Sequence, residues 1–457
     1  MPSRARPTSA GLVERLRRVP PLLVLSLWAL HLALPLQLLQ HLRWVVFGQV
    51  VPIYYFFTVV PLIAAGILAA ALKRRWTRWE LLWWLLPLLC LPGLAVSGDR
   101  LWSARQWFSW IIRGVVPGGV LLISPRDGVR EFVTRLLYPL MIAAAVFGLT
   151  ELYFYHFPPN YLRWDRIMAA VFHVKDTDPV LAVNGDKPGL LYRPAQAVYP
   201  LPTERVPGGT QANRVPYAAI LLPFLCVGLW LWRHARGKPI QAGALACLFS
   251  ILLLAQVRAV WVASFVSLAT LLACGFYTRW RQALKPALAV LVVACVYLSW
   301  LPTRRFLAPR LASFSSSETS IHERLAVLKT AAVLRDRWAT GIGFGRFPDV
   351  CRAFYPAGLP WNETPDDQYL RWAIENGIPG LILLGAFLAG FVRRGLAATR
   401  RLEVREADYR RVLLAGWAGL AVSFFFFDGF YWGSCNMSFW CLLGLFGSGL
   451  FAAPAPA

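Results

Sequence analysis

Long apolar runs separated by short polar segments recur along the chain from residue 20 to residue 451. Most of these runs reach about 17 to 25 residues, the length that an α-helix needs to cross about 30 Å of hydrocarbon. The pattern therefore predicts an all-α polytopic membrane protein with about twelve transmembrane helices. The predicted spans are residues 20–40, 46–72, 79–97, 106–124, 130–150, 215–233, 240–256, 259–277, 284–301, 373–392, 411–427 and 430–451.

Two connections, residues 151–214 and 302–372, are too long to be simple links between spans. The second contains a capping-box pattern, Ser320 and Glu323, at the start of an apolar repeat. The repeat, Ile321, Leu325, Leu328 and Ala332, predicts an amphipathic helix over the membrane face. The predicted organisation is a basic tail (1–19), helices 1–5 (20–150), a first outer loop (151–214), helices 6–9 (215–301), a second outer loop (302–372) and helices 10–12 (373–451).

Composition and charge agree with a membrane protein. Of the 457 residues 57% are apolar and only 15% are charged, whereas soluble chains contain about 25% charged residues. A formal net charge of +24 would indicate a nucleic-acid partner in a soluble protein, but here the basic residues fall between the spans. Alternate connections are rich in Lys and Arg, as in KRRWTRWE and WRHARGKP, and these are predicted to be cytoplasmic together with both termini. The two long loops then face outward, and we expect no nucleic acid among the partners.

Arginines on the predicted outer side are candidates for binding an anion. Arg258 interrupts an apolar stretch, where a charged side chain at the centre of a bilayer costs about 2.5 to 3.5 kcal/mol on insertion scales. It either faces a polar cavity or reaches the interface from a tight turn. Arg205 and Arg214 flank a glycine-rich turn, and Arg324 lies on the predicted outer helix. Planar guanidinium groups match phosphate oxygens, although ordinary solvated loops would also contain such residues.

Two adjacent acids, Asp366 and Asp367, precede the apolar run that begins near residue 373. Acids at a helix amino terminus accept backbone N–H groups and oppose the positive end of the dipole, so capping is one interpretation. Capping needs only one of them, which leaves a chemical role for the other. A divalent cation bound by both acids is a further alternative.

Four segments in order along the chain resemble the O-antigen ligase and polymerase superfamily, which includes the Wzy-type and ligase-type glycosyltransferases. They are GGTQANRVPYAAILLP, LLLAQVRAVW, HERLAVLKTAAVLRDRWATGIGFGRF and DDQYLRWAIENGIPG. The family's last motif is His, then Asn, Ser or Gln, nine residues, Gly, two residues, and Gly, Thr or Tyr. Here Gly377 and Gly380 keep the spacing, while Asp366 and Asp367 occupy the His and amide positions. The family's Ser-x-Ser-Arg is represented only by its arginine, Arg258.

The resemblance implies an inverting, metal-independent glycosyltransferase without a cofactor. It implies transfer of undecaprenyl-diphosphate-linked glycan to a saccharide or to lipid A core, at the periplasmic face of a bacterial inner membrane. Its partners would be membrane lipids and other polysaccharide assembly proteins. Asp366 would be the general base and Arg258 the principal diphosphate contact. The supporting residues would be Arg205, Arg214, Arg324, Asp367 and His322, the last as an alternative imidazole near Arg324.

A polymerase is favoured over a ligase. Two other classes stay open on the sequence. A transporter or flippase of lipid-linked sugar is consistent with many spans and a cationic cavity, although no inverted repeat is evident. A non-catalytic assembly protein is consistent with the absence of the family histidine.

Overall fold

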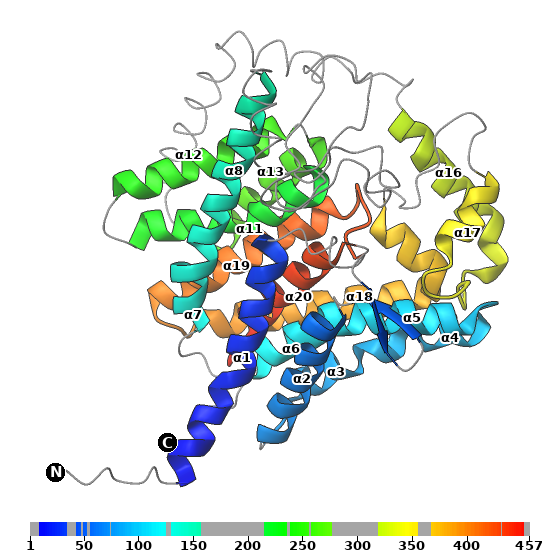
Figure 1. Cartoon of the computed structure of the whole chain (residues 1–457), viewed down its shortest axis with the longest axis horizontal. Helices are drawn as coiled ribbons and strands as arrows, with labels where there is room; N and C mark the ends of the chain where they lie inside the picture. The colour runs from blue at the N-terminus through cyan, green and yellow to red at the C-terminus, as the bar shows by residue number, and fades with distance from the viewer. Residues whose placement is uncertain are drawn as a thin grey trace.

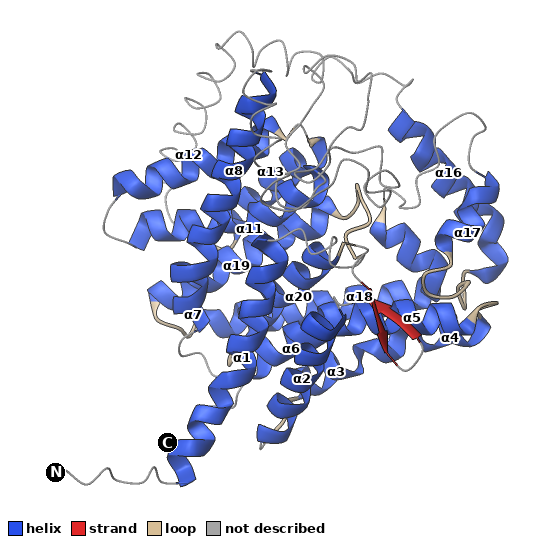
Figure 2. Ribbon diagram, viewed as in Figure 1, coloured by secondary structure: helices blue, strands red, loops and turns tan. Residues whose placement is uncertain are grey.

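The fold is helical apart from one short hairpin among the residues that the structure describes (Figure 2). The computed structural model describes residues 9–33, 43–46, 49–52, 55–73, 75–124, 129–156, 214–234, 238–255, 257–276, 319–354, 367–430 and 432–451. The longer helices are α1 (Ser9–Ala33), α2 (Val60–Leu72), α5 (Arg100–Trp110), α8 (Tyr138–His156), α11 (Arg214–His234), α12 (Lys238–Leu254), α13 (Arg258–Ala273), α16 (Thr319–Val333), α18 (Gln368–Thr399), α19 (Val404–Ser423) and α20 (Gly433–Gly447). The shorter ones are α3 (Arg78–Leu85), α4 (Leu91–Val96), α6 (Val116–Ile123), α7 (Val129–Phe132) and α17 (Phe347–Cys351).

Single turns of 3₁₀ or π geometry join or extend several of these helices. The π turn Ile111–Val115 runs directly from α5 into α6, and a 3₁₀ turn, Leu86–Cys90, joins α3 to α4. Prolines at the start of the next segment, such as Pro117 in α6, remove a backbone donor and favour such local changes of pitch. The other turns are Tyr55–Val59, Val133–Leu137, Leu334–Arg337 and Arg352–Phe354.

The predicted all-α membrane architecture is confirmed in its coarser form. Five helical stretches among the described residues are long and apolar enough to cross a membrane: Arg78–Val96, Arg100–Ile123, Val129–Thr150, Val215–His234 and Gln368–Thr399. Three shorter apolar helices, Phe57–Leu72, Lys238–Leu254 and Arg258–Ala273, also coincide with predicted spans. The count of twelve is not confirmed, and the predicted span 284–301 lies outside the described residues.

The predicted span 46–72 is wrong at its start. Residues Arg43–Val46 (β1) and Gln49–Pro52 (β2) form an antiparallel hairpin, with Val46 opposite Gln49 and Arg43 opposite Pro52. Pairs of β-branched valines in both strands favour this extended conformation. The helix therefore begins only after the hairpin, first as a π turn and then as α2.

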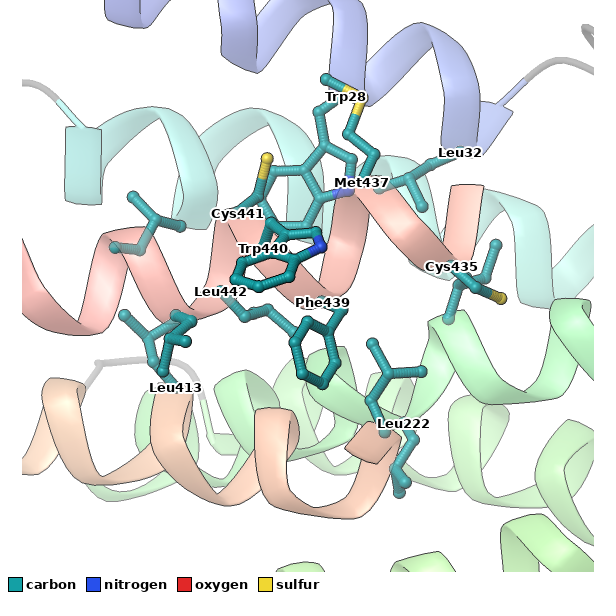
Figure 3. Close-up of a cluster of buried hydrophobic side chains, with 14 of the residues drawn as sticks. Trp28, Leu32, Leu222, Leu413, Cys435, Met437, Phe439, Trp440, Cys441 and Leu442 are labelled. Atoms are coloured by element: carbon teal, nitrogen blue, oxygen red, sulfur yellow. The ribbon is translucent and has the colours of Figure 1, made fainter. Parts of the chain in front are cut away.

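Helix α20 lies at the centre of the bundle, and all its residues from Ser434 to Gly447 are buried. Figure 3 shows side chains from α1, α11 and α19, including Trp28, Leu222 and Leu413, gathered around Phe439 and Trp440. Where helices are surrounded by lipid, close van der Waals packing of small residues stabilises their association. Gly118 of α6 meets this requirement, because a Cβ there would lie 2.5 Å from the carbonyl oxygen of Trp440.

Connections predicted to be cytoplasmic gather at one end of the bundle. The Arg130 guanidinium contacts Glu406 at 3.0 Å, and the ring of His234 lies 2.9 Å from the Asp408 carboxylate. Ser448 donates to the carbonyl of Ser124 at 3.1 Å. We call this the basic end. The end of α11 and the start of α19 therefore lie together there.

Candidate functional site

In the described part of the chain, α11, α13, α18 and α20 begin at the opposite end of the bundle, which we call the convergent end. The starts of α18 and α20 lie beside the end of α19 and the start of α11, respectively. Gln368 N donates to the carbonyl of Phe424 at 2.9 Å, and the Cys435 thiol lies 3.8 Å from the carbonyl of Pro216. Helix amino termini carry a partial positive charge, so an end formed by several of them favours an anionic ligand.

Arg258 also lies at the convergent end, because α13 runs antiparallel to α19. The last turn of α13 is at the start of α19, where Arg411 donates to the carbonyl of Gly275 at 3.4 Å. Further along α19, a Cβ on Gly419 would lie 2.9 Å from the carbonyl of Ala263. The first residue of α13, Arg258, is therefore level with the end of α19, at the same end of the bundle as Asp367.

Asp367 caps α18. Its backbone is extended, and its Oδ1 accepts from the backbone N–H groups of Tyr369 and Leu370, both at 3.0 Å. This is the geometry by which an N-cap carboxylate satisfies donors that have no partner within the helix. The cap fixes the chain direction at the start of α18, immediately after Asp366.

A buried ion triad lies one turn further along α18. Arg371 Nε contacts Glu375 Oε1 at 2.9 Å, and Arg371 Nη1 pairs with Asp428 in the turn before α20. The side chains of Arg371, Glu375 and Asp428 are 10%, 3% and 1% exposed. Glu375 Oε1 also accepts from the backbone N–H of Phe347 at 3.1 Å. The triad thus joins α17, α18 and the turn before α20 through charged hydrogen bonds.

Helix α18 breaks just after this triad. Gly377 has φ of 79° and ψ of 159°, a conformation that only glycine adopts at low cost. A Cβ at Gly377 would lie 2.7 Å from the carbonyl oxygen of Ala339. Pro379 follows and has no N–H to donate to the preceding turn. Glycine and proline therefore both favour the break at this point.

The segment before α17 supplies the hydrogen bonds that the broken helix lacks. In an unbroken helix, the carbonyls of Ile374 and Glu375 would accept from residues 378 and 379. Here they accept instead from a glycine-rich loop that lies against the break. The bonds run from Ile342 N to Ile374 O (3.0 Å), from Gly343 N to Glu375 O (3.1 Å) and from Ile378 N to Trp338 O (2.7 Å).

Replacing Gly377 with alanine is expected to lower the free energy of unfolding by about 1–3 kcal/mol, because the side chain forces a strained φ and meets Ala339. The measurement is the thermal unfolding midpoint of the purified protein in detergent. Gly385→Ala is the matched control, since Gly385 lies in the regular part of α18 and a Cβ added there would meet nothing within 4 Å. Helix propensity predicts a slight stabilisation for that variant. Equal midpoints for the two variants would contradict the strain argument.

The structure places only some of the predicted site residues. Arg258 and Asp367 both lie at the convergent end, as described above. Arg214 is the first residue of α11, and His322 and Arg324 lie in the first half of α16. Arg205 and Asp366 lie outside the described residues.

Sequence reasoning did not identify Arg371 and Glu375. The available signal was a pair of opposite charges four residues apart at the start of a predicted span, a spacing at which helical side chains meet. Asp428 stands in an apolar segment, FFFFDGFYW, but its pairing with Arg371 joins residues 57 positions apart and depends on the tertiary fold. The pattern of the sequence alone contains no sign of it.

A protein-family model described as O-Antigen ligase matches residues 242–385. This range includes α13, α16, α17, the glycine-rich loop and the broken first part of α18. No curated protein matches the chain. The match supports the assignment of the chain to an O-antigen ligase/polymerase-like family of membrane enzymes.

Proposed function

We propose that this protein transfers or polymerises undecaprenyl-diphosphate-linked glycan at the outer face of the bacterial inner membrane. The observation that carries the proposal is that the O-antigen ligase match, residues 242–385, includes the starts of α13 and α18, two of the helices that begin at the convergent end. The convergence of helix amino termini supports binding of an anionic diphosphate there. Both chain termini would then be cytoplasmic and the convergent end periplasmic.

Asp366 would accept the proton of the attacking sugar hydroxyl. A carboxylate within hydrogen-bond reach of the hydroxyl can act as the general base. Asp367, the next residue in the chain, caps α18 at the convergent end. The proton leaves the hydroxyl as the new glycosidic bond forms with inversion at the anomeric carbon.

Arg258 would bind the departing diphosphate. A guanidinium group stays charged at all relevant pH values and binds phosphate oxygens in a fork, so it stabilises negative charge as the glycosidic bond to the carrier breaks. Arg205, Arg214 and Arg324, with His322, would complete the phosphate and substrate contacts. No metal ion is needed for this step.

Replacing Arg258 with alanine is expected to reduce glycan transfer by about 10²–10³-fold while the protein stays in the membrane. Lysine at this position keeps the charge but lacks the paired N–H donors that bind two phosphate oxygens at once. We therefore expect Arg258→Lys to reduce glycan transfer by an intermediate factor of about tenfold. Arg105→Ala is the control, because Arg105 is an exposed arginine of α5. Wild-type surface polysaccharide in the Arg258→Ala strain would refute the assigned role.

The glycans that accumulate identify the reaction. We favour a polymerase, which joins repeat units, over a ligase, which joins glycan to lipid A core. Mass analysis of glycans from cells with the Arg258→Ala variant should then show single repeats on the carrier. Full-length polymer that is not attached to lipid A core would instead indicate a ligase. Flux of lipid-linked sugar across proteoliposomes, without any change of chain length, would indicate a transporter.

A further inference from the structure

Helix α16 has two apolar faces, of which the described part of the fold uses one. Val327 and Ala331 are buried against Phe347 and Ile374, forming a small cluster separate from the main core. Leu325 and Leu328, which belong to the predicted apolar repeat, lie on the other face and are 46% and 55% exposed. Leu325 and Leu328 of the sequence repeat therefore lie on the exposed face of α16. The face that packs against the protein is formed by Val327 and Ala331.

The uncovered face continues into the turn after α16 and carries cations at its edges. Val333 and Trp338 are 56% and 42% exposed, which extends the apolar surface. Lys329, Arg335 and Arg337 are exposed beside it, whereas Asp336 is the acid of this segment. An apolar helix face bordered by basic residues and a tryptophan is typical of helices that lie in the membrane interface. We call this set of residues the interface face.

The interface face lies beside the part of α18 that faces lipid. The carbonyl of Trp338 accepts a hydrogen bond from the backbone N–H of Ile378 at 2.7 Å, at the break in α18. Ile382 and Leu383 follow about one helical turn later and are 62% and 54% exposed. Figure 1 shows α16 and α17 together on one side of the bundle.

The part of α18 that follows its break is long enough to cross a membrane by itself. Residues 378–399 number 22, which at about 1.5 Å per residue exceeds the hydrocarbon layer of about 30 Å. The break at Gly377, to which the loop after α16 is bonded, therefore lies at one end of this membrane-crossing part.

We propose that the interface face binds the membrane itself, with Leu325 and Leu328 among the upper acyl chains and Lys329, Arg335 and Arg337 on the phosphates of anionic phospholipids. Long basic side chains extend their charged ends to the headgroups while their stems cover apolar surface. Charge complementarity favours anionic lipid over a neutral or cationic partner. This inference concerns the lipid contact alone and does not depend on the proposed glycan transfer.

Photo-crosslinking in the full-length protein tests the apolar contact. The crosslinker p-benzoylphenylalanine is placed at Leu328 and, separately, at Leu325, with the protein in nanodiscs of phosphatidylglycerol and phosphatidylcholine. Arg352, which is exposed on the Arg352–Phe354 turn, is the control position. We expect crosslinks to lipid at both leucines, at least about fivefold more than at Arg352. Crosslinks to protein, or no crosslinks, at both leucines would overturn the proposal.

Native mass spectrometry tests the headgroup contact in the same nanodiscs. The Lys329→Gln, Arg335→Gln, Arg337→Gln triple variant is expected to retain phosphatidylglycerol less than wild type does, relative to phosphatidylcholine. Arg352→Gln should leave that ratio unchanged. All four side chains are exposed, so gel filtration of each variant is expected to match wild type. An unchanged lipid ratio in the triple variant would overturn the assignment to anionic headgroups.

Discussion

Replacing Asp366 with asparagine is expected to lower glycan transfer by about 10²–10⁴-fold, the range typical for loss of a general base. Asparagine has nearly the same size and keeps hydrogen bonding, but its amide does not accept the hydroxyl proton. Histidine at this position should recover much of the rate, because it restores the base that the resembling family carries there. The measurement is formation of product from a lipid-linked donor by the purified protein in proteoliposomes.

The control for Asp366→Asn is Asp349→Asn. Asp349 is a surface acid that pairs with Arg346 at 2.9 Å, and its side chain is 57% exposed. Surface ion pairs contribute little to stability, so this variant should transfer glycan at the wild-type rate. A rate for Asp366→Asn within about threefold of wild type would contradict its role as the base. Inactivity of Asp366→His together with full activity of Asp366→Asn would assign a non-catalytic role to this position.

Hydrophobic patterning predicted most of the helices but not their local geometry. A run of apolar residues establishes that a segment is buried or faces lipid, and the helices at 214–234, 238–254 and 258–273 agree with it closely. Patterning does not distinguish a helix from a short apolar strand, which is why β2 was assigned to the start of the span 46–72. The π turn between α5 and α6 likewise leaves no mark on the apolar pattern.

The site was predictable where the signal is local. The Asp367 cap follows from a carboxylate next to an apolar run, and Gly377 with Pro379 marks a break in a helix. The role of the loop before α17 was not predictable, because its backbone bonds to α18 join segments that are distant in sequence. On α16, the regular apolar repeat predicted one apolar face toward the membrane. The second apolar face, which packs against Phe347 and Ile374, was not predictable because those two residues are distant in sequence.

Replacing Arg371 with methionine is expected to lower the free energy of unfolding by about 3–5 kcal/mol, the typical cost of removing one partner of a buried ion pair. Methionine fills much of the volume, but the Glu375 and Asp428 carboxylates then have no cation between them in a buried site. The measurement is the free energy of unfolding in mixed micelles of dodecyl sulfate and a mild detergent.

The control for Arg371→Met separates charge from packing. In the variant Arg371→Met, Glu375→Gln, Asp428→Asn all three charges are removed together, while the shapes stay similar. Replacement of a complete buried charge group is often close to neutral, so this variant should recover most of the lost stability. Equal stability of the single variant and wild type would show that the triad is hydrated rather than buried. Equal losses in the single and triple variants would show that the lost stability does not come from uncompensated carboxylate charge, and the proposed cost of leaving Glu375 and Asp428 without a cation would be wrong.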